Sequence, residues 1–168
     1  MSKTFSIAID AMGGDNSPDK TIKGIKIFLD RNKSNKDFIL NVFGKSEEID
    51  TCLKKYNITS DLVNVINTNS TVSDEETPLT AVKNSKNTSM WNCIQHQLEG
   101  KSDISLSAGN TGVLLVISRM ILKTISGVNK PALAGLLTSL IIFKIILDIT
   151  SKTPVLPADK LISDFPSN

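Results

Sequence analysis

The sequence has few of the residue types that metal centres, disulfide frameworks and nucleic-acid interfaces require. Its 168 residues include two cysteines, which lie far apart along the chain, and one histidine. Structural zinc needs clustered ligands, so we expect no metal site and no disulfide, and Cys52 and Cys93 should be free, buried thiols. Aromatic residues make up only 5% and the formal net charge is +2. Stacking platforms and a basic field are therefore both missing, and no nucleic-acid partner is expected.

Long apolar segments are missing as well. The most apolar run, residues 132–143, lies between Lys130 and Lys144. It is shorter than the roughly 20 residues that span a bilayer, so no transmembrane segment is predicted. The polar start of the chain does not resemble the apolar region of a secretory leader. We therefore expect a cytoplasmic protein.

What the sequence does contain is an ordinary globular composition, with 40% hydrophobic and 21% charged residues. Short β-rich runs alternate with amphipathic stretches, which predicts an α/β fold. We expect one domain over residues 1–149 and a divergent polar tail over 150–168, which contains three of the prolines. Strands are predicted at residues 4–10, 38–43, 62–66, 103–107 and 144–149, and helices at 46–56, 89–99 and 113–125.

A further helix is predicted after residue 17. Ser17 should cap it, with Pro18 at its first position, where the missing N–H is not needed. Ile22, Ile25 and the Phe28-Leu29 pair recur at helical spacing and predict one buried face. Ser46 precedes an acidic first turn, Glu47 and Glu48, which suits the positive end of a helix dipole.

The strongest local pattern is Ser107-Ala108-Gly109-Asn110-Thr111-Gly112 between a predicted strand and a predicted helix. Glycines here let the backbone approach an anion, and a helix N-terminus presents free N–H groups. Ser107, Asn110 and Thr111 add side-chain donors. The pattern suits phosphate, or the oxyanion of an acyl transfer. The alternative is a well-capped turn without a ligand, and the lysine of a P-loop is missing.

A second pattern, Asp10-Ala11-Met12-Gly13-Gly14-Asp15, ends the first predicted strand. Ligands collect at this end of the strands in open α/β sheets. Asp10 and Asp15 could orient a substrate hydroxyl, hold a cation, or bond to backbone N–H groups and fix the turn around Gly13 and Gly14. The last of these is favoured on chemistry alone.

The third pattern covers residues 74–90. Lys83 and Lys86 are three apart and would share a face if they lie on a helix. Thr88 and Ser89 follow as hydroxyl donors and as a cap for the next helix. Such a face suits an acidic ligand, either phosphate or an acidic carrier protein; a solvated helix face is the alternative. His96 has no evident partner and is interpreted as structural or superficial.

Taken together, residues 8–15, 74–90, 107–112 and 127–137 resemble, in order and spacing, the motifs of the phosphate acyltransferase family of bacterial phospholipid synthesis. The resemblance implies a three-layer α/β sandwich with a mostly parallel sheet, of the isopropylmalate-dehydrogenase-like or phosphotransacetylase-like type, here incomplete. A phosphotransacetylase-type enzyme acting on coenzyme A thioesters matches the motifs less well.

The reaction implied by this resemblance joins inorganic phosphate to the acyl group of a long-chain acyl-acyl-carrier protein and needs no cofactor. The implied partners are acyl carrier protein and inorganic phosphate; full-length members are expected to form homodimers and to associate peripherally with membranes. The site residues it implies are Ser107 and Asn110 as catalytic residues, with Gly109, Thr111, Gly112, Lys83, Lys86, Ser89, Asp10, Gly13, Gly14 and Asp15 as phosphate or substrate contacts.

The sequence also departs from the family pattern. Lys83 and Lys130 replace usual arginines, which removes a bidentate fork. The pattern is lost after Asp148, and the chain is expected to be the N-terminal half of a family-length protein. We therefore expect it to be inactive alone. It would be a remnant, a half completed by a separate second chain, or a module that binds acyl carrier protein or phosphate.

Overall fold

The chain forms a parallel sheet with helices and, separately, a small antiparallel pair of strands. The computed structural model describes residues 4–72, 80, 84–124, 126–128, 134–137 and 145–148. These fall into two units, Met1–Lys123 and Thr124–Asn168. In the second unit β5 (Ala134–Leu137) pairs antiparallel with β6 (Ile145–Asp148). The first unit carries the predicted site motifs that the structure describes.

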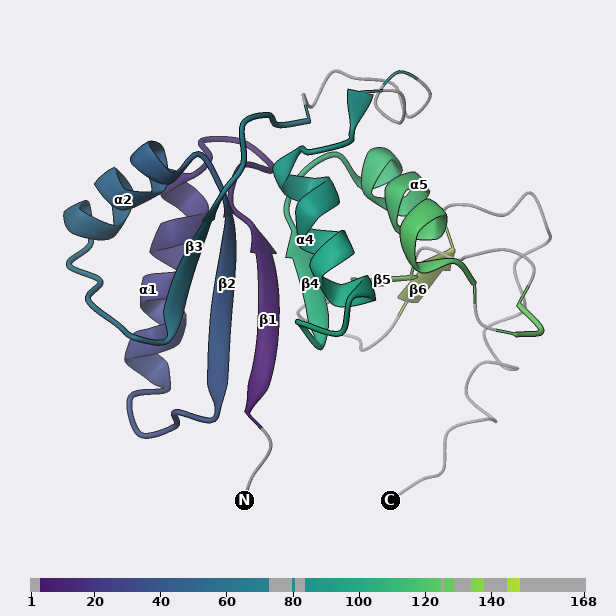
Figure 1. Ribbon diagram of the computed structural model, residues 1–168. Helices are drawn as coiled ribbons and strands as arrows, with labels where there is room; N and C mark the ends of the chain where they lie inside the picture. The colour runs from purple at the N-terminus through teal and green to yellow at the C-terminus, as the bar shows by residue number, and fades with distance from the viewer. Residues whose placement is uncertain are drawn as a thin grey trace, which may run out of the picture. The chain divides into compact units, whose positions relative to one another are not determined.

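Four parallel strands make up the sheet of the first unit. They are β1 (Phe5–Asp10), β2 (Phe38–Gly44), β3 (Val63–Asn67) and β4 (Ile104–Ser107), in the spatial order β3-β2-β1-β4 (Figure 1). Because all four run the same way, their carboxyl ends meet at one edge. The strand order reverses direction between β1 and β4, which is where open α/β sheets bind ligands.

Helices cover both faces of this sheet. On one face α1 (Asp19–Arg31) and α2 (Ser46–Lys55) pack against each other and against β1 and β2. On the other, α4 (Ser89–Leu98) lies over β1, β2 and β4, with α5 (Thr111–Leu122) beside it (Figure 1). These layers confirm the predicted three-layer α/β class with a mostly parallel sheet. None of the described helices is long and apolar enough to cross a membrane.

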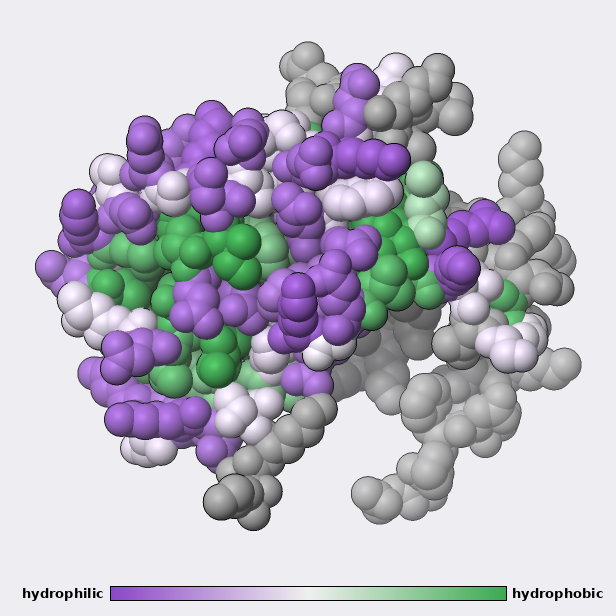
Figure 2. All heavy atoms as spheres, in the orientation of Figure 1, coloured by the Kyte–Doolittle hydropathy of each residue, from purple (hydrophilic) through white to green (hydrophobic). Residues whose placement is uncertain are grey.

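Apolar surface remains exposed on the first unit. Figure 2 shows hydrophobic residues grouped over β2 and β3 and over α5 on the viewed face. On the edge strand β4, Ile104 and Leu106 are 39% and 48% exposed. The pleat places both on the face that α1 and α2 cover elsewhere, so these helices do not reach over β4.

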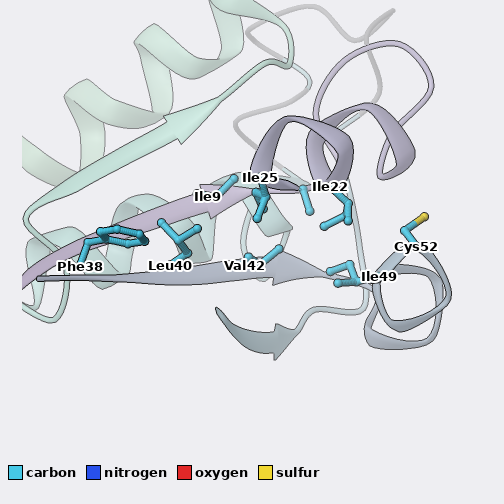
Figure 3. Close-up of a cluster of buried hydrophobic side chains, with 9 residues drawn as sticks. Ile9, Ile22, Ile25, Phe38, Leu40, Val42, Ile49 and Cys52 are labelled. Atoms are coloured by element: carbon cyan, nitrogen blue, oxygen red, sulfur yellow. The ribbon is translucent and has the colours of Figure 1, made fainter. Parts of the chain in front are cut away.

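The largest buried cluster joins α1 and α2 to the sheet. Ile22 and Ile25 of α1 point toward Ile9 of β1 and Val42 of β2 (Figure 3). Ile22 and Val42 are fully buried, so the helical spacing predicted Ile22 and Ile25 correctly, whereas Phe28 of the same predicted face is 38% exposed. The opposite face packs Ala8 and Phe43 against Cys93, and α4 against α5 through Met90, Ile94, Val113, Ile117 and Ile121.

The predicted cap of α1 is wrong. Pro18, not Ser17, occupies the N-cap of α1, because the Ser17 hydroxyl donates instead to the carbonyls of Gly13 and Gly14 at 2.6 and 2.7 Å. Ser46 is the first residue of α2 and Lys45 is its cap.

The other predicted strands and helices of the first unit begin and end within about two residues of those observed, apart from the end of the last helix. That helix, α5, ends at Leu122, and the structure does not describe Ile125. Cys52 and Cys93 are free and buried, as expected. The predicted tail at 150–168 lies outside the described residues, and the domain division at 149 stays a prediction.

Candidate functional site

The two glycine-containing turns predicted as separate motifs meet at the carboxyl edge of the sheet. Asp10 and Ser107 are opposite each other in the β1–β4 register. The Ser107 hydroxyl donates to Asp10 Oδ2 at 2.7 Å, and the Gly109 amide donates to Ser107 Oγ at 3.1 Å. The Ser107 hydroxyl therefore connects the end of β1 to the turn that precedes α5.

Glycine is required where the turns touch. A Cβ on Gly13 would lie 2.6 Å from the Gly109 nitrogen. Gly14 has φ +84°, and a Cβ there would lie 2.6 Å from the Ala108 carbonyl oxygen. Backbone atoms cannot move aside as a flexible side chain can, so any larger residue would push the two turns apart. The glycines therefore allow the two turns to approach each other, whereas the predicted approach of an anion to this backbone stays a prediction.

Asp10 is buried in this junction, at 2% exposure. Its Oδ1 accepts the Met12 amide at 3.1 Å while Oδ2 accepts Ser107. Both oxygens hold backbone or side chain in place, which fits the turn-fixing interpretation of Asp10. Asp15 is exposed and lines the mouth of an adjoining groove. The contact of either carboxylate with a substrate stays a prediction.

Helix α5 begins directly after the turn that forms this junction. Asn110 is its N-cap, and its Oδ1 accepts the Val113 amide at 3.1 Å. The preceding turn is not buried: Ala108 and Thr111 are exposed. Thr111 and Gly112 are the first two residues of α5, and the amides of a helix's first turn have no acceptor within the helix. The first turn of α5 therefore offers amides and the positive end of a helix dipole to an anion.

A second helix N-terminus lies beside the first. Thr88 caps α4, and its Oγ1 accepts the Trp91 amide at 3.2 Å. The first turn of α4 reaches the glycine junction, because a Cβ on Gly109 would lie 2.9 Å from Met90 Cε. Two helix dipoles therefore have their positive ends at the same edge, which sequence reasoning from one motif at a time did not reveal.

The basic segment is only partly described. Ser89 is the first residue of α4, is 1% exposed, and donates its amide to the Ser70 carbonyl at 3.0 Å. Lys86 is exposed in a turn, not on a helix, so the predicted shared helix face does not extend to it. Lys83 lies outside the described residues. Among the described residues no group of three or more histidine, cysteine or acidic side chains could hold a metal.

His96 lies on α4, away from the two turns. Its Nδ1 is 2.8 Å from Ser102 Oγ, and its ring packs edge-on against Phe43. Burial and the nearby Lys101 charge lower its pKa. These contacts fit the predicted structural role.

An apolar groove of about 570 Å³ adjoins the junction. It lies between α1 and the β1–β4 part of the sheet. Asp10, Gly13, Gly14, Ser107 and Ala108 form its polar end, and its apolar wall includes Ile7, Ile9, Ile25, Phe28, Leu40 and Leu106. Sequence analysis missed the groove because its walls come from elements distant in the chain.

Comparison with known proteins gives the family. Residues 5–162 match the model of the family described as fatty acid synthesis protein. A phosphate acyltransferase of Pelagibacter ubique is 42% identical over 165 residues, which is 98% of this chain and 47% of the relative. The phosphate acyltransferase of Neisseria meningitidis is 35% identical over 135 residues, or 80% of this chain and 38% of the relative. The chain thus spans less than half the length of these curated relatives.

A solved structure supports the fold. The EutD phosphotransacetylase from Staphylococcus aureus superposes with a TM-score of 0.51 at 15% identity, covering 82% of this chain and 44% of that protein. The likeness extends to the fold alone, as predicted for a phosphotransacetylase-like sandwich. The match of the family model over most of the sequence shows that the chain belongs to the fatty acid synthesis protein family, the family of these phosphate acyltransferases.

Proposed function

We propose that the chain provides the phosphate-binding half of an acyltransferase that forms acyl phosphate from inorganic phosphate and a long-chain acyl-acyl-carrier protein, for phospholipid synthesis. The supporting observation is the Asp10–Ser107 hydrogen bond of 2.7 Å, which fixes two glycine turns beneath the N-termini of α4 and α5. The names of the relatives support the same reaction class.

In this proposal the α5 N-terminus binds phosphate. The Thr111 and Gly112 amides point from the first turn of the helix, where the dipole favours an anion. Asp10 and Ser107 act as positioning residues, because the Ser107 hydroxyl already donates to Asp10 and accepts from Gly109. A direct contact of Ser107 or Asn110 with the reacting atoms stays a prediction.

The chemistry needs no covalent enzyme intermediate. A phosphate oxygen attacks the thioester carbonyl carbon, the C–S bond breaks, and the proton of hydrogen phosphate passes to the leaving thiolate. Backbone amides that the fold already holds in position stabilise the carbonyl oxygen as it becomes negative. The chain's share of catalysis is to hold phosphate and stabilise charge.

We propose further that the chain is inactive alone and needs the rest of the fold. Among the described residues the sheet ends at β4, beside the candidate site, and the Leu106 side chain on β4 is 48% exposed. Misplacement by about 1 Å can cost on the order of 100-fold in rate. A separate second-half chain, or a larger polypeptide containing this one, would supply the missing walls.

Asn110→Asp tests the phosphate site while keeping the helix cap. Aspartate caps as well as asparagine does, so the melting temperature should be unchanged. Its negative charge beside Thr111 should weaken phosphate binding at least tenfold, measured by phosphorus NMR titration of the 168-residue chain. Asn110→Ser is the control, because it keeps a capping oxygen without the charge. Equal phosphate affinity in Asn110→Asp and the wild type would refute the proposed anion site.

Activity is tested by co-expression with the remaining half of the Pelagibacter ubique relative. Acyl phosphate made from palmitoyl-acyl-carrier protein is trapped with hydroxylamine. The pair should be active and the chain alone inactive; in the pair, Asn110→Asp should lower the rate about 100-fold or more. Turnover by the isolated chain would contradict the proposed dependence on a second half. An inactive pair in which phosphate still binds would favour the non-catalytic alternative.

A further inference from the structure

The groove between α1 and the sheet contains a glycine that neither the backbone nor the packing requires. Gly24 lies inside α1 and lines the groove. A Cβ at Gly24 would meet no heavy atom within 4 Å. Glycine inside a helix costs roughly 0.5–1 kcal/mol relative to alanine. The cost is therefore not offset by any contact within the described residues.

Other glycines of the first unit differ from Gly24 in this respect. At Gly13, Gly44 and Gly109 an added Cβ would lie under 3.0 Å from another atom. Gly14 and Gly100 have positive φ, which strains any other residue. Gly24 has neither reason, and what it leaves is open space along the groove.

The groove is polar at one end and apolar along the rest of its length. Its polar end is the Asp10–Ser107 junction, and its walls farther along are apolar, with Phe28 on α1 and Ile7 on β1. From Thr21 to Phe28 the helix rises about 10 Å, at roughly 1.5 Å per residue. The volume of about 570 Å³ lies within the usual range for ligand pockets. An occupant therefore has one polar end at the junction and an extended apolar body.

We infer that this groove binds the alkyl chain of the acyl substrate, with the acyl carbonyl at the Asp10–Ser107 end and Gly24 leaving room for the chain. The inference rests on the proposed function. An alkyl chain is favoured over a polypeptide segment because the groove leads directly into the proposed phosphate site. Its wall also includes Leu106, a half-exposed apolar side chain that an alkyl chain would cover.

The test uses the 168-residue chain and alkylphosphonates from butyl to decyl, which combine an anionic head with a chain of graded length. Isothermal titration calorimetry should show affinity rising about fourfold per added methylene. The rise should level off once the chain extends beyond the groove. Inorganic phosphate should compete with every member of the series.

Gly24→Leu should fill the groove, so that decylphosphonate binds no more tightly than butylphosphonate. Lys23→Leu is the matched control: it adds a leucine to the same helix at an exposed position that does not line the groove. It should keep the full length dependence. Circular dichroism confirms that both variants are folded.

The outcomes separate the two proposals. Affinity independent of chain length, or length dependence that survives Gly24→Leu, would overturn the groove assignment while leaving the phosphate site intact. Absence of any alkylphosphonate binding would also overturn it. Length dependence that Gly24→Leu abolishes, without competition by inorganic phosphate, would support the groove and refute the phosphate site. If there is no length dependence and Gly24→Leu changes the sedimenting mass, the groove holds a polypeptide instead.

Discussion

At the scale of single residues, Ser107 connects the two halves of the candidate site. Its hydroxyl donates to the buried Asp10 carboxylate and accepts from the Gly109 amide, so both of its hydrogen-bonding functions are used. A hydrogen bond to a charged group contributes roughly 1.5–3 kcal/mol. The position of the turn from Ser107, which is proposed to bind phosphate, should therefore depend on the Ser107–Asp10 hydrogen bond.

Ser107→Ala is expected to lower the free energy of unfolding by about 1–3 kcal/mol, because it leaves Asp10 Oδ2 without its donor. Asp10→Asn should also destabilise, and the double variant should be less destabilised than the sum of the singles. Urea denaturation measures all three. Additive effects, within about 0.5 kcal/mol, would show that the 2.7 Å contact carries no coupling.

At the scale of elements, a three-residue contact joins the start of α1 to the end of α2. Asp19 accepts from Lys55 Nζ at 2.6 Å and from the Tyr56 hydroxyl at 2.8 Å. These hydrogen bonds lower the pKa of Asp19, and the bond to Asp19 raises the pKa of Lys55. All three groups are accessible to solvent, so salt should weaken the contact.

The pH dependence follows from these directions. Because the pKa of Asp19 is lowered on folding, its contribution is present above the ordinary value of 3.8 and is lost as pH falls through the folded pKa. Because the pKa of Lys55 is raised, its contribution is present below 10.5 and is lost as pH rises through the folded value. Asp19→Asn should therefore reduce the melting temperature most between these limits and least in acid.

Asp30→Asn is the matched control for that series. Among the described residues Asp30 pairs with Lys26 of α1 and with Lys33, two residues beyond the end of α1, and does not contact α2; it lies in the last turn, where the dipole disfavours a negative charge. Its loss should change the melting temperature little at any pH. Equal effects of the two substitutions on the melting temperature would show that the contact between α1 and α2 adds no stability.

At the scale of the whole molecule, the sheet has an unprotected edge within the described residues. β4 pairs only with β1 there, and it carries Ile104 and Leu106 on an exposed face. Edge strands with apolar side chains promote association unless they are covered or charged. The expected dependence on a partner has its structural origin here.

The chain should self-associate, and Ile104→Lys should weaken the association. Losing one buried apolar side chain costs about 1.5–3 kcal/mol, so the dissociation constant should rise about tenfold or more. Sedimentation velocity measures it. Met120→Lys, on α5 and 49% exposed, is the control away from the edge. If both lysines act alike, general surface hydrophobicity drives association and the β4 edge has no special role.

Much of the fold could be predicted from local patterns. The alternation of β-rich and amphipathic segments predicted the α/β class and most strand and helix positions, because each element's periodicity is written in its own residues. The turns at Gly13-Gly14 and from Ser107 were likewise predicted between their flanking elements. The cap at Ser17 was wrong because its hydroxyl donates to the nearby Gly13 and Gly14 carbonyls, an alternative that the sequence pattern does not distinguish from capping.

The sequence by itself therefore determined the elements, their turns and the family motifs. Only the tertiary structure decided that Asp10 and Ser107, 97 residues apart, share a hydrogen bond, and that α1 and β4 enclose a groove at Gly24. Both depend on β4 lying beside β1. Strand order is set by burial and pairing summed over the whole unit, so no single segment of the sequence encodes it.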